Sequence, residues 1–142
     1  MTAFVLDASV ALAWMVDNPV PPYAAKISEV IAGGRRALVP SLWILEMANG
    51  LLMAERRGKL TAPEVEHGLR QLEVVVAGGI EIDAATALTV RETFSAAYTH
   101  QLTAYDAAYL ELARREGLPL ATLDKSLRTA AAKVGVRAMV VS

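Results

Sequence analysis

The sequence predicts an α/β fold in which helices cover both faces of a parallel sheet. Short apolar runs typical of buried strands alternate with longer segments whose apolar residues recur at helical spacing. The 142 residues fit one domain, 1–142, and a hydrophobic content of 54% is sufficient for a large core. Since strands that alternate with helices pair in parallel, we expect a single three-layer α/β/α domain.

Five strands are expected, because five short apolar runs are bounded by turn or helix signals. They cover residues 3–6, 37–39, 80–82, 118–122 and 136–141. Asp7 follows the first run directly, Pro40 interrupts the second and Asp83 ends the third. These short, uninterrupted apolar runs are typical of strands buried on both faces.

Seven helices are expected between these strands, separated by loops such as 17–22. Ser41 is a candidate cap for the third helix, and Thr61 with Glu64 forms a capping-box signature for the fourth. Glycine follows the second, third and sixth helices, as is common at helix ends. The predicted ranges are 9–16, 23–32, 42–57, 61–76, 83–98, 103–116 and 124–135.

Composition excludes several classes of protein. The chain has no cysteine and two histidines, so disulfides, thiolate catalysis and Cys- or His-rich metal sites are excluded. A net charge of −1 argues against simple charge-driven binding of nucleic acid, which would need a local basic patch or a bound cation. Residues 1–7 lack the pattern of a signal peptide, and no apolar run approaches the ~20 residues of a membrane helix. We therefore expect the protein to be located in the cytoplasm.

Three aspartates occur at strand ends or helix starts. Asp7 follows the first strand and Asp124 the fourth, and ligands of open parallel sheets bind outside the carboxyl ends of strands. Asp106 lies in the third helical position after Thr103. Each aspartate has an alternative interpretation as a helix-capping residue.

Glu46 is the most informative acidic residue. It lies in SLWILEMANGLLMA, beyond the first turn of a helix that is apolar on nearly every side. A glutamate is rarely buried unless it is paired or coordinates a ligand, and no Lys or Arg lies within one turn of it. The alternative is a salt bridge to a basic residue distant in sequence.

The four carboxylates together predict a divalent-cation site. Four such groups around one cleft would raise one another's pKa values and destabilise the fold, and a cation would remove that cost. A hard cation such as Mg²⁺ needs few direct carboxylates, and it would activate water for phosphodiester hydrolysis without a serine–histidine pair. Ser9, Asn49 and Thr122 are candidate supporting residues, although each is also explicable as ordinary polar structure.

The chain resembles the PIN-domain ribonucleases of the VapC toxin type along nearly its whole length. The matching segments are FVLDASV, PSLWILEMANGL, TAYDAAYLELA and ATLDKSLRTAAAKVG, in this order. The resemblance implies a parallel four- or five-stranded sheet of order 3-2-1-4-5. It implies that Asp7, Glu46, Asp106 and Asp124 are the catalytic and metal-binding residues for Mg²⁺ or Mn²⁺. It further implies cleavage of RNA, a homodimer and a cognate VapB-type antitoxin.

Basic residues are candidates for contacts with the RNA backbone. Arg114, Arg115, Lys125 and Arg128 lie on the two helices that begin near the acids. Residues 56, 57 and 59 form a second basic cluster, and for most of these residues a solvated helix face is the simpler interpretation.

Three alternative functions are considered. A receiver-type signalling domain would need a phosphoacceptor aspartate after a middle strand, and Asp83 is a poor candidate. A haloacid-dehalogenase-type phosphatase would need an aspartate where Ser9 stands. The third alternative is an inactive PIN-like module that binds RNA or protein, against which the intact acids argue.

Overall fold

A four-stranded parallel sheet forms the centre of the protein. The computed structural model describes residues 2–84 and 88–142. Within them, the strands β1 (Phe4–Leu6), β2 (Ala37–Pro40), β3 (Ile80–Asp83) and β4 (Leu120–Ala121) pair in the order β3-β2-β1-β4. All three residues of β1 are fully buried, as expected for a central strand. The predicted parallel sheet and the order 3-2-1-4 are confirmed.

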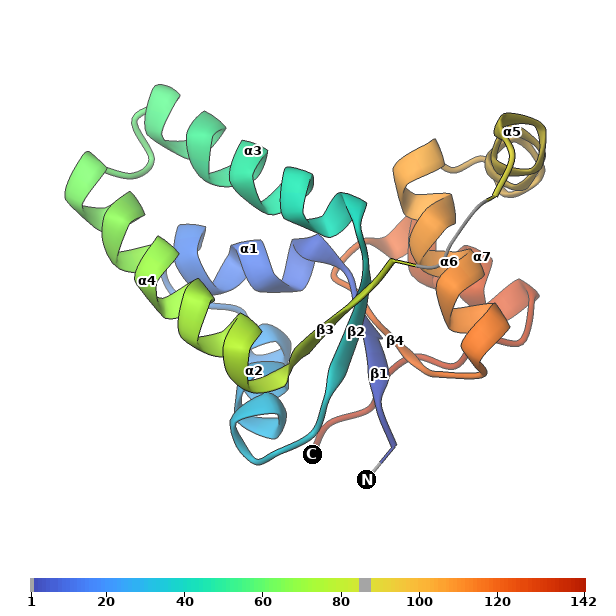
Figure 1. The fold of residues 1–142 in the computed structure, drawn as a ribbon, viewed down its shortest axis with the longest axis horizontal. Helices are drawn as coiled ribbons and strands as arrows, with labels where there is room; N and C mark the ends of the chain where they lie inside the picture. Colours follow the sequence, from blue (N-terminus) through green and yellow to red (C-terminus); the bar gives the residue numbers. More distant parts are fainter. Residues whose placement is uncertain (1, 85–87) are drawn as a thin grey trace.

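Helices cover both faces of the sheet (Figure 1). On one face lie α1 (Ala8–Val16), α2 (Pro22–Ala32), α3 (Leu42–Arg56) and α4 (Ala62–Gly79). On the other lie α5 (Val90–His100), α6 (Ala104–Glu116) and α7 (Lys125–Lys133). The three-layer α/β/α prediction is therefore confirmed. Among the described helices, none combines the length and the apolar character that a membrane span requires.

The predicted fifth strand, 136–141, is reduced to a bridge. Ala138 pairs in parallel with Leu120, whose amide donates to the carbonyl of Arg137 while its carbonyl accepts from the amide of Met139. Only Val136 and Met139 are buried in this segment. Their spacing of three does not match the two-residue repeat of a regular strand, so the ladder does not extend.

The helix expected at 83–98 begins later than predicted. Asp83 is the last residue of β3, and α5 begins at Val90 with Thr89 as its cap. The Thr89 hydroxyl accepts a 3.1 Å hydrogen bond from the Glu92 amide, and this cap decides the start. Residues 85–87 of the predicted helix lie outside the described residues.

The two capping predictions for α3 and α4 have opposite outcomes. Thr61 and Glu64 form the predicted capping box: the Thr61 amide donates to Glu64 Oε1 over 2.9 Å, and the Glu64 amide donates to Thr61 Oγ1 over 3.3 Å. The prediction that Ser41 caps α3 is wrong. Its backbone already has helical angles, φ −58° and ψ −29°, so its hydroxyl is not placed to accept from the next turn, and no side-chain cap forms.

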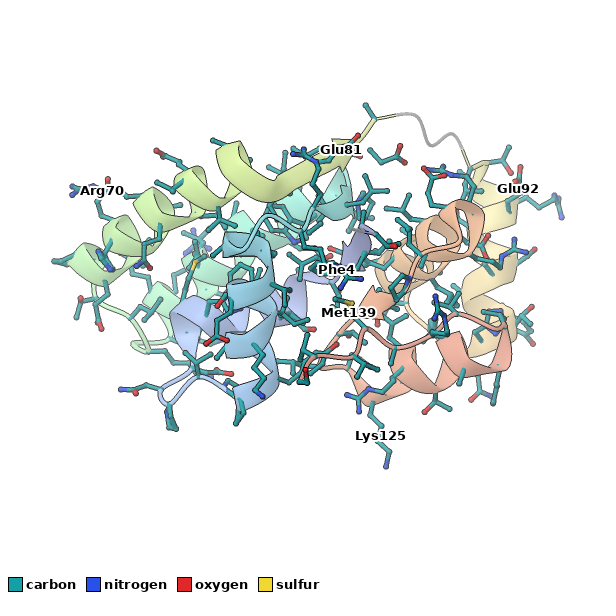
Figure 2. The ribbon with its side chains drawn as sticks, turned by 90° about the horizontal axis from the view of Figure 1, so that it is seen from below. Phe4, Arg70, Glu81, Glu92, Lys125 and Met139 are labelled. Carbon is teal, nitrogen blue, oxygen red and sulfur yellow. The ribbon has the colours of Figure 1, made fainter. Side chains whose placement is uncertain are left out.

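The core lies between the sheet and its two helical layers. Phe4 is fully buried, and Figure 2 shows it near the middle of the molecule. Both α1 and α3 begin at the carboxyl end of the sheet, opposite the two chain termini (Figure 1). The fold therefore brings the segments that follow β1, β2 and β4 to one end, where the candidate acids lie.

Candidate active site

Asp7 is a buried carboxylate at the end of β1. It occupies the N-cap position of α1, but its side chain makes no capping hydrogen bond, so the capping alternative is wrong for this residue. Only 4% of Asp7 is exposed. A buried carboxylate needs polar partners or a cation. Burial raises the pKa of Asp7, and the charge of Asp124 raises it further.

Two hydroxyl groups hold the same oxygen of Asp7. Ser9 Oγ donates to Asp7 Oδ2 over 2.6 Å, and Thr122 Oγ1 donates to it over 2.7 Å. Both hydrogen bonds lower the pKa of Asp7 and so oppose the effect of burial. Among the described residues, no side chain donates to Asp7 Oδ1. The two hydroxyls thus fix the orientation of the carboxylate, and a backbone hydrogen bond from Ala8 also lowers its pKa.

The same hydroxyls tie β1 to the segment after β4. Ser9 Oγ accepts from the amide of Leu123 over 3.0 Å, and Thr122 Oγ1 accepts from the amide of Asp124 over 3.0 Å. Each hydroxyl therefore donates to Asp7 and accepts from backbone. Ser9 and Thr122 act as positioning residues for Asp7, a more specific role than the sequence predicts.

Asp124 is a helix cap as well as a candidate site residue. Its Oδ1 accepts a 3.0 Å hydrogen bond from the amide of Leu127, so the capping interpretation is confirmed here. Capping uses one carboxylate oxygen. Asp124 also lies close enough to Asp7 and Asp106 for its charge to raise both pKa values. The cap is therefore observed, and the role of Asp124 in a metal site stays a prediction.

Glu46 on α3 is held by a tyrosine from the opposite face of the sheet. The hydroxyl of Tyr109 on α6 donates to Glu46 Oε1 over 2.6 Å, and Tyr109 is fully buried. The predicted alternative, a salt bridge to a distant basic residue, is wrong, because Glu46 forms no ion pair with any described residue. Burial raises the pKa of Glu46, the Tyr109 hydrogen bond lowers it, and the charge of Asp7 raises it.

Sequence reasoning missed Tyr109. The signal was its position three residues after Asp106, which places both on neighbouring parts of one face of α6. An aromatic residue in an apolar helix is normally interpreted as a core residue. Nothing in the sequence shows that the Tyr109 hydroxyl has a carboxylate partner on α3. Only the packing of α6 and α3 around the sheet reveals that relationship.

Asp106 is the acid whose pKa is raised by the charges of all three other acids. Its pKa is raised to about 6, first by burial and then by the charges of Asp7, Asp124 and Glu46. The Thr103 hydroxyl accepts from the Asp106 amide over 3.1 Å, but the reciprocal bond of a capping box is absent between these two described residues. Asp106 therefore does not behave as a simple capping-box carboxylate, and all four predicted acids lie at one end of the sheet.

The donor set fits a hard divalent cation. Every candidate ligand is a carboxylate or hydroxyl oxygen, the type that Mg²⁺ and Mn²⁺ prefer. Burial raises the pKa of Asp7, Glu46 and Asp106, the charges of neighbouring acids raise these pKa values further, and a cation would offset both effects. No three Asp, Glu or His side chains of the described residues lie close enough together to hold a metal ion by themselves. A Mg²⁺ ion needs only one or two direct carboxylates and takes its other ligands from water.

The four basic residues predicted to contact RNA differ in whether they already have a carboxylate partner. Arg114 donates to Glu111 over 2.8 Å, and Arg115 donates to Asp83 over 2.8 Å, so both already have carboxylate partners. Lys125 and Arg128 are exposed and form no ion pair with any described residue. Lys125 extends from α7 away from the body of the protein (Figure 2).

Two cavities are lined by the predicted supporting residues, and none of the four acids is among the lining residues of either. Ser9 and Asn49 line one of about 350 Å³ between α1 and α3, whereas Thr122 and Arg128 line another of about 290 Å³. Asn49 is exposed and makes no hydrogen bond to Glu46, so it does not orient that residue here. A more apolar cavity of about 480 Å³ between α1, α2 and α4 contains none of the four acids.

Known proteins share this sequence pattern and fold. Residues 4–133 match the PIN domain. Ribonuclease VapC3 of Pyrobaculum aerophilum is 37% identical over 83 residues, which are 58% of this chain and 61% of the length of that relative. The crystal structure of PAE2754 from the same organism superposes with a TM-score of 0.67 at 25% identity, covering 91% of this chain and 79% of the other.

A domain of a functionally unknown protein from Methanocaldococcus jannaschii has the same fold, with a TM-score of 0.58 at 16% identity. It covers 100% of this chain and 92% of that chain. The family match extends over most of the chain and includes all four acids. The protein therefore belongs to the PIN-domain family.

Proposed function

We propose that this protein is a Mg²⁺- or Mn²⁺-dependent endoribonuclease that hydrolyses RNA phosphodiester bonds. The observation that carries the proposal is that four acids lie at one end of the sheet, where burial and then the charges of Asp7, Asp124 and Glu46 raise the pKa of Asp106 to about 6. Such a cluster is costly in an empty cleft and useful around a cation. The similarity to a protein named Ribonuclease VapC3 supports RNA as the substrate.

The chain's own residues would hold the cation and the substrate. When bound, the ion would lower the pKa of a coordinated water and offset charge on the scissile phosphate. Asp7 would offer Oδ1, since Ser9 and Thr122 occupy Oδ2. Glu46 would be oriented by Tyr109, and Asp106 with Asp124 would hold water or a second ion. The fixed orientation of Asp7 and Glu46 would reduce the reorganisation needed during reaction.

We propose further that the protein is the toxin of a VapBC-type pair and acts in the cytoplasm. The resemblance to VapC toxins supports this role and a cognate VapB-type antitoxin. Exposed apolar side chains support a homodimer: on α3, Ile44 is 50% exposed and Leu45 73%. Large exposed apolar groups that lie next to each other mark interaction surfaces more often than scattered single residues do.

RNA cleavage by purified protein tests the proposed activity. We expect cleavage of single-stranded RNA with Mg²⁺ or Mn²⁺, and loss of cleavage in EDTA or with Asp7→Asn. Glu73→Gln is a matched control, because Glu73 is an exposed carboxylate on α4 that lies outside the four acids. Full activity in EDTA would refute the metal requirement. Intact RNA across a broad panel, with RNA binding retained, would favour a binding module instead.

A further inference from the structure

A groove leads away from the acids between α1 and α3. At one end it is lined by Ser9, whose hydroxyl holds Asp7, and by Asn49, one turn beyond Glu46 on α3. Its apolar floor includes Leu12 and Met53, and the cavity volume is about 350 Å³. The groove therefore begins beside residues that neighbour Asp7 and Glu46, although none of the four acids is among its lining residues.

The opposite end of the groove is basic. Arg57 and Lys59, which follow α3, both line it and both are exposed. Neither forms an ion pair with any residue in 2–84 or 88–142. In this they differ from Arg114 and Arg115, which are paired with Glu111 and Asp83. The two cations at this end of the groove are free to bind an anion.

One acidic residue also lines the groove. Asp17, at the end of α1, places a carboxylate in a lining that otherwise carries Arg57 and Lys59 as its charged groups. The net charge of the lining is therefore positive, two cations against one anion. The groove thus runs from residues that neighbour Asp7 and Glu46 at one end to a basic surface at the other.

We infer that this α1–α3 groove binds the sugar–phosphate backbone of the single-stranded RNA substrate, with Arg57 and Lys59 contacting phosphates at the end of the groove away from the scissile bond. The inference rests on the proposed ribonuclease function. Phosphate contacts position a nucleic acid without reading its sequence. The chain's net charge of −1 gives little overall attraction for RNA, so local cations must supply it.

The length of the groove fits a short piece of strand. Asn49 and Arg57 are eight positions apart, which corresponds to about 12 Å along a helix. At a stacked rise of 3.4 Å per nucleotide, this distance accommodates roughly three to four nucleotides. The apolar floor at Leu12 and Met53 lies along the same path and would contact sugars or bases. We therefore place the backbone of these nucleotides along α3.

Salt-dependent RNA binding tests the groove. Fluorescently labelled single-stranded RNA is titrated with protein carrying Asp7→Asn, which prevents cleavage, between 50 mM and 200 mM salt. Each phosphate contact contributes about 0.7 to the slope of log affinity against log salt for a single strand. Arg57→Ala with Lys59→Ala should lower that slope by about 1.4 and weaken binding about 25-fold at 0.1 M salt.

A matched control separates the effect of losing the groove cations from the effect of losing any two positive charges. Arg91 and Lys26 are exposed, form no ion pair with any described residue and do not line the groove. Replacing both by alanine removes the same charge and should leave the slope nearly unchanged. In protein with Asp7 intact, the groove variant should raise KM for cleavage with little effect on kcat, because the two side chains do not reach the reacting atoms.

If the groove and control variants change RNA affinity and its salt dependence equally, the inference that the groove binds RNA is refuted. The proposed ribonuclease function would remain in place. A wild-type protein that neither binds nor cleaves RNA would overturn both. Melting temperatures within a few degrees of wild type verify that the variants fold, as expected for exposed side chains.

Discussion

The hydroxyl of Tyr109 donates a 2.6 Å hydrogen bond to Oε1 of Glu46, linking α6 on one face of the sheet to α3 on the other. The bond positions a half-buried carboxylate that has no basic partner among the described residues. We expect Tyr109→Phe to lower the free energy of unfolding by about 1 kcal/mol, the usual contribution of one hydrogen bond. Urea denaturation measures this change.

The effect on the site separates this role from simple packing. Because the Tyr109 hydrogen bond lowers the pKa of Glu46, its removal should raise that pKa further and weaken Mg²⁺ binding. Tyr105→Phe is the control, since Tyr105 lies on the same helix but is 61% exposed. If both variants bind Mg²⁺ with wild-type affinity, Tyr109 does not position a metal-binding carboxylate.

Neutralising one acid should have opposite effects without and with metal. In EDTA, Asp106→Asn should raise the melting temperature, because it relieves repulsion from three nearby charges. Wild-type protein should gain about 2.7 kcal/mol from metal at a hundredfold excess over Kd. The variant should lose much of that gain, since a neutral amide is a weaker ligand for a hard cation.

Asp124→Asn and Glu46→Gln extend the same experiment. Asparagine caps helices about as well as aspartate, so Asp124→Asn keeps the bond from Leu127 and changes only charge. Melting curves of each protein in EDTA and in millimolar Mg²⁺ or Mn²⁺ give the metal-induced shift in melting temperature. Identical metal-induced shifts in wild type and all variants would place these acids outside the metal site.

Metal-free protein should become less stable as pH rises from about 4 to about 6. The pKa of Asp106 is about 6 in the folded protein, above its ordinary value of 3.8, so folding favours the protonated form. This cost is absent below the unfolded value, grows between the two values and is constant above the folded one. Asp7 and Glu46 act in the same direction.

Thermal unfolding in EDTA across pH 3.5 to 7 measures this dependence, with Asp106→Asn as the comparison. The variant should show a flatter profile over the same range, because it lacks the most strongly shifted of the acids. Parallel profiles for the two proteins would mean that Asp106 is not destabilised by its neighbours.

Thr122→Val should separate hydroxyl chemistry from packing at the end of β4. Valine keeps the shape of this buried residue but removes the donor to Asp7 and the acceptor for the Asp124 amide. We expect a loss of about 1–3 kcal/mol in unfolding free energy and a marked fall in RNA cleavage. Thr122→Ser should restore cleavage. Failure of serine to rescue would assign Thr122 a packing role only.

A homodimer should be observed by light scattering at micromolar concentration. Leu45→Glu should shift it toward monomer, because this 73% exposed side chain lies on the proposed α3 surface. Val74 on α4 is also 73% exposed, so Val74→Glu is a control of equal exposure. A monomeric wild type, or equal effects of both substitutions, would argue against an α3 interface.

The sequence by itself determined the layers of the fold. The alternation of apolar runs with helical segments predicts the parallel sheet, because a strand buried on both faces must be apolar throughout, as β1 is. The capping box at Thr61 and Glu64 is equally local and was predicted. Boundaries that depend on tertiary packing were predicted less well: the segment at 136–141 pairs only at Ala138.

The sequence also selected Asp7, Glu46, Asp106 and Asp124, because acids at strand ends and in an apolar helix need an explanation. Their partners were decided by tertiary structure alone. Ser9 and Thr122 share one oxygen of Asp7 across 113 positions of chain, and Tyr109 reaches Glu46 across 63. Hydrogen bonds between residues so far apart in the sequence depend on how β1, β4, α3 and α6 pack together. No local sequence signal specifies that packing.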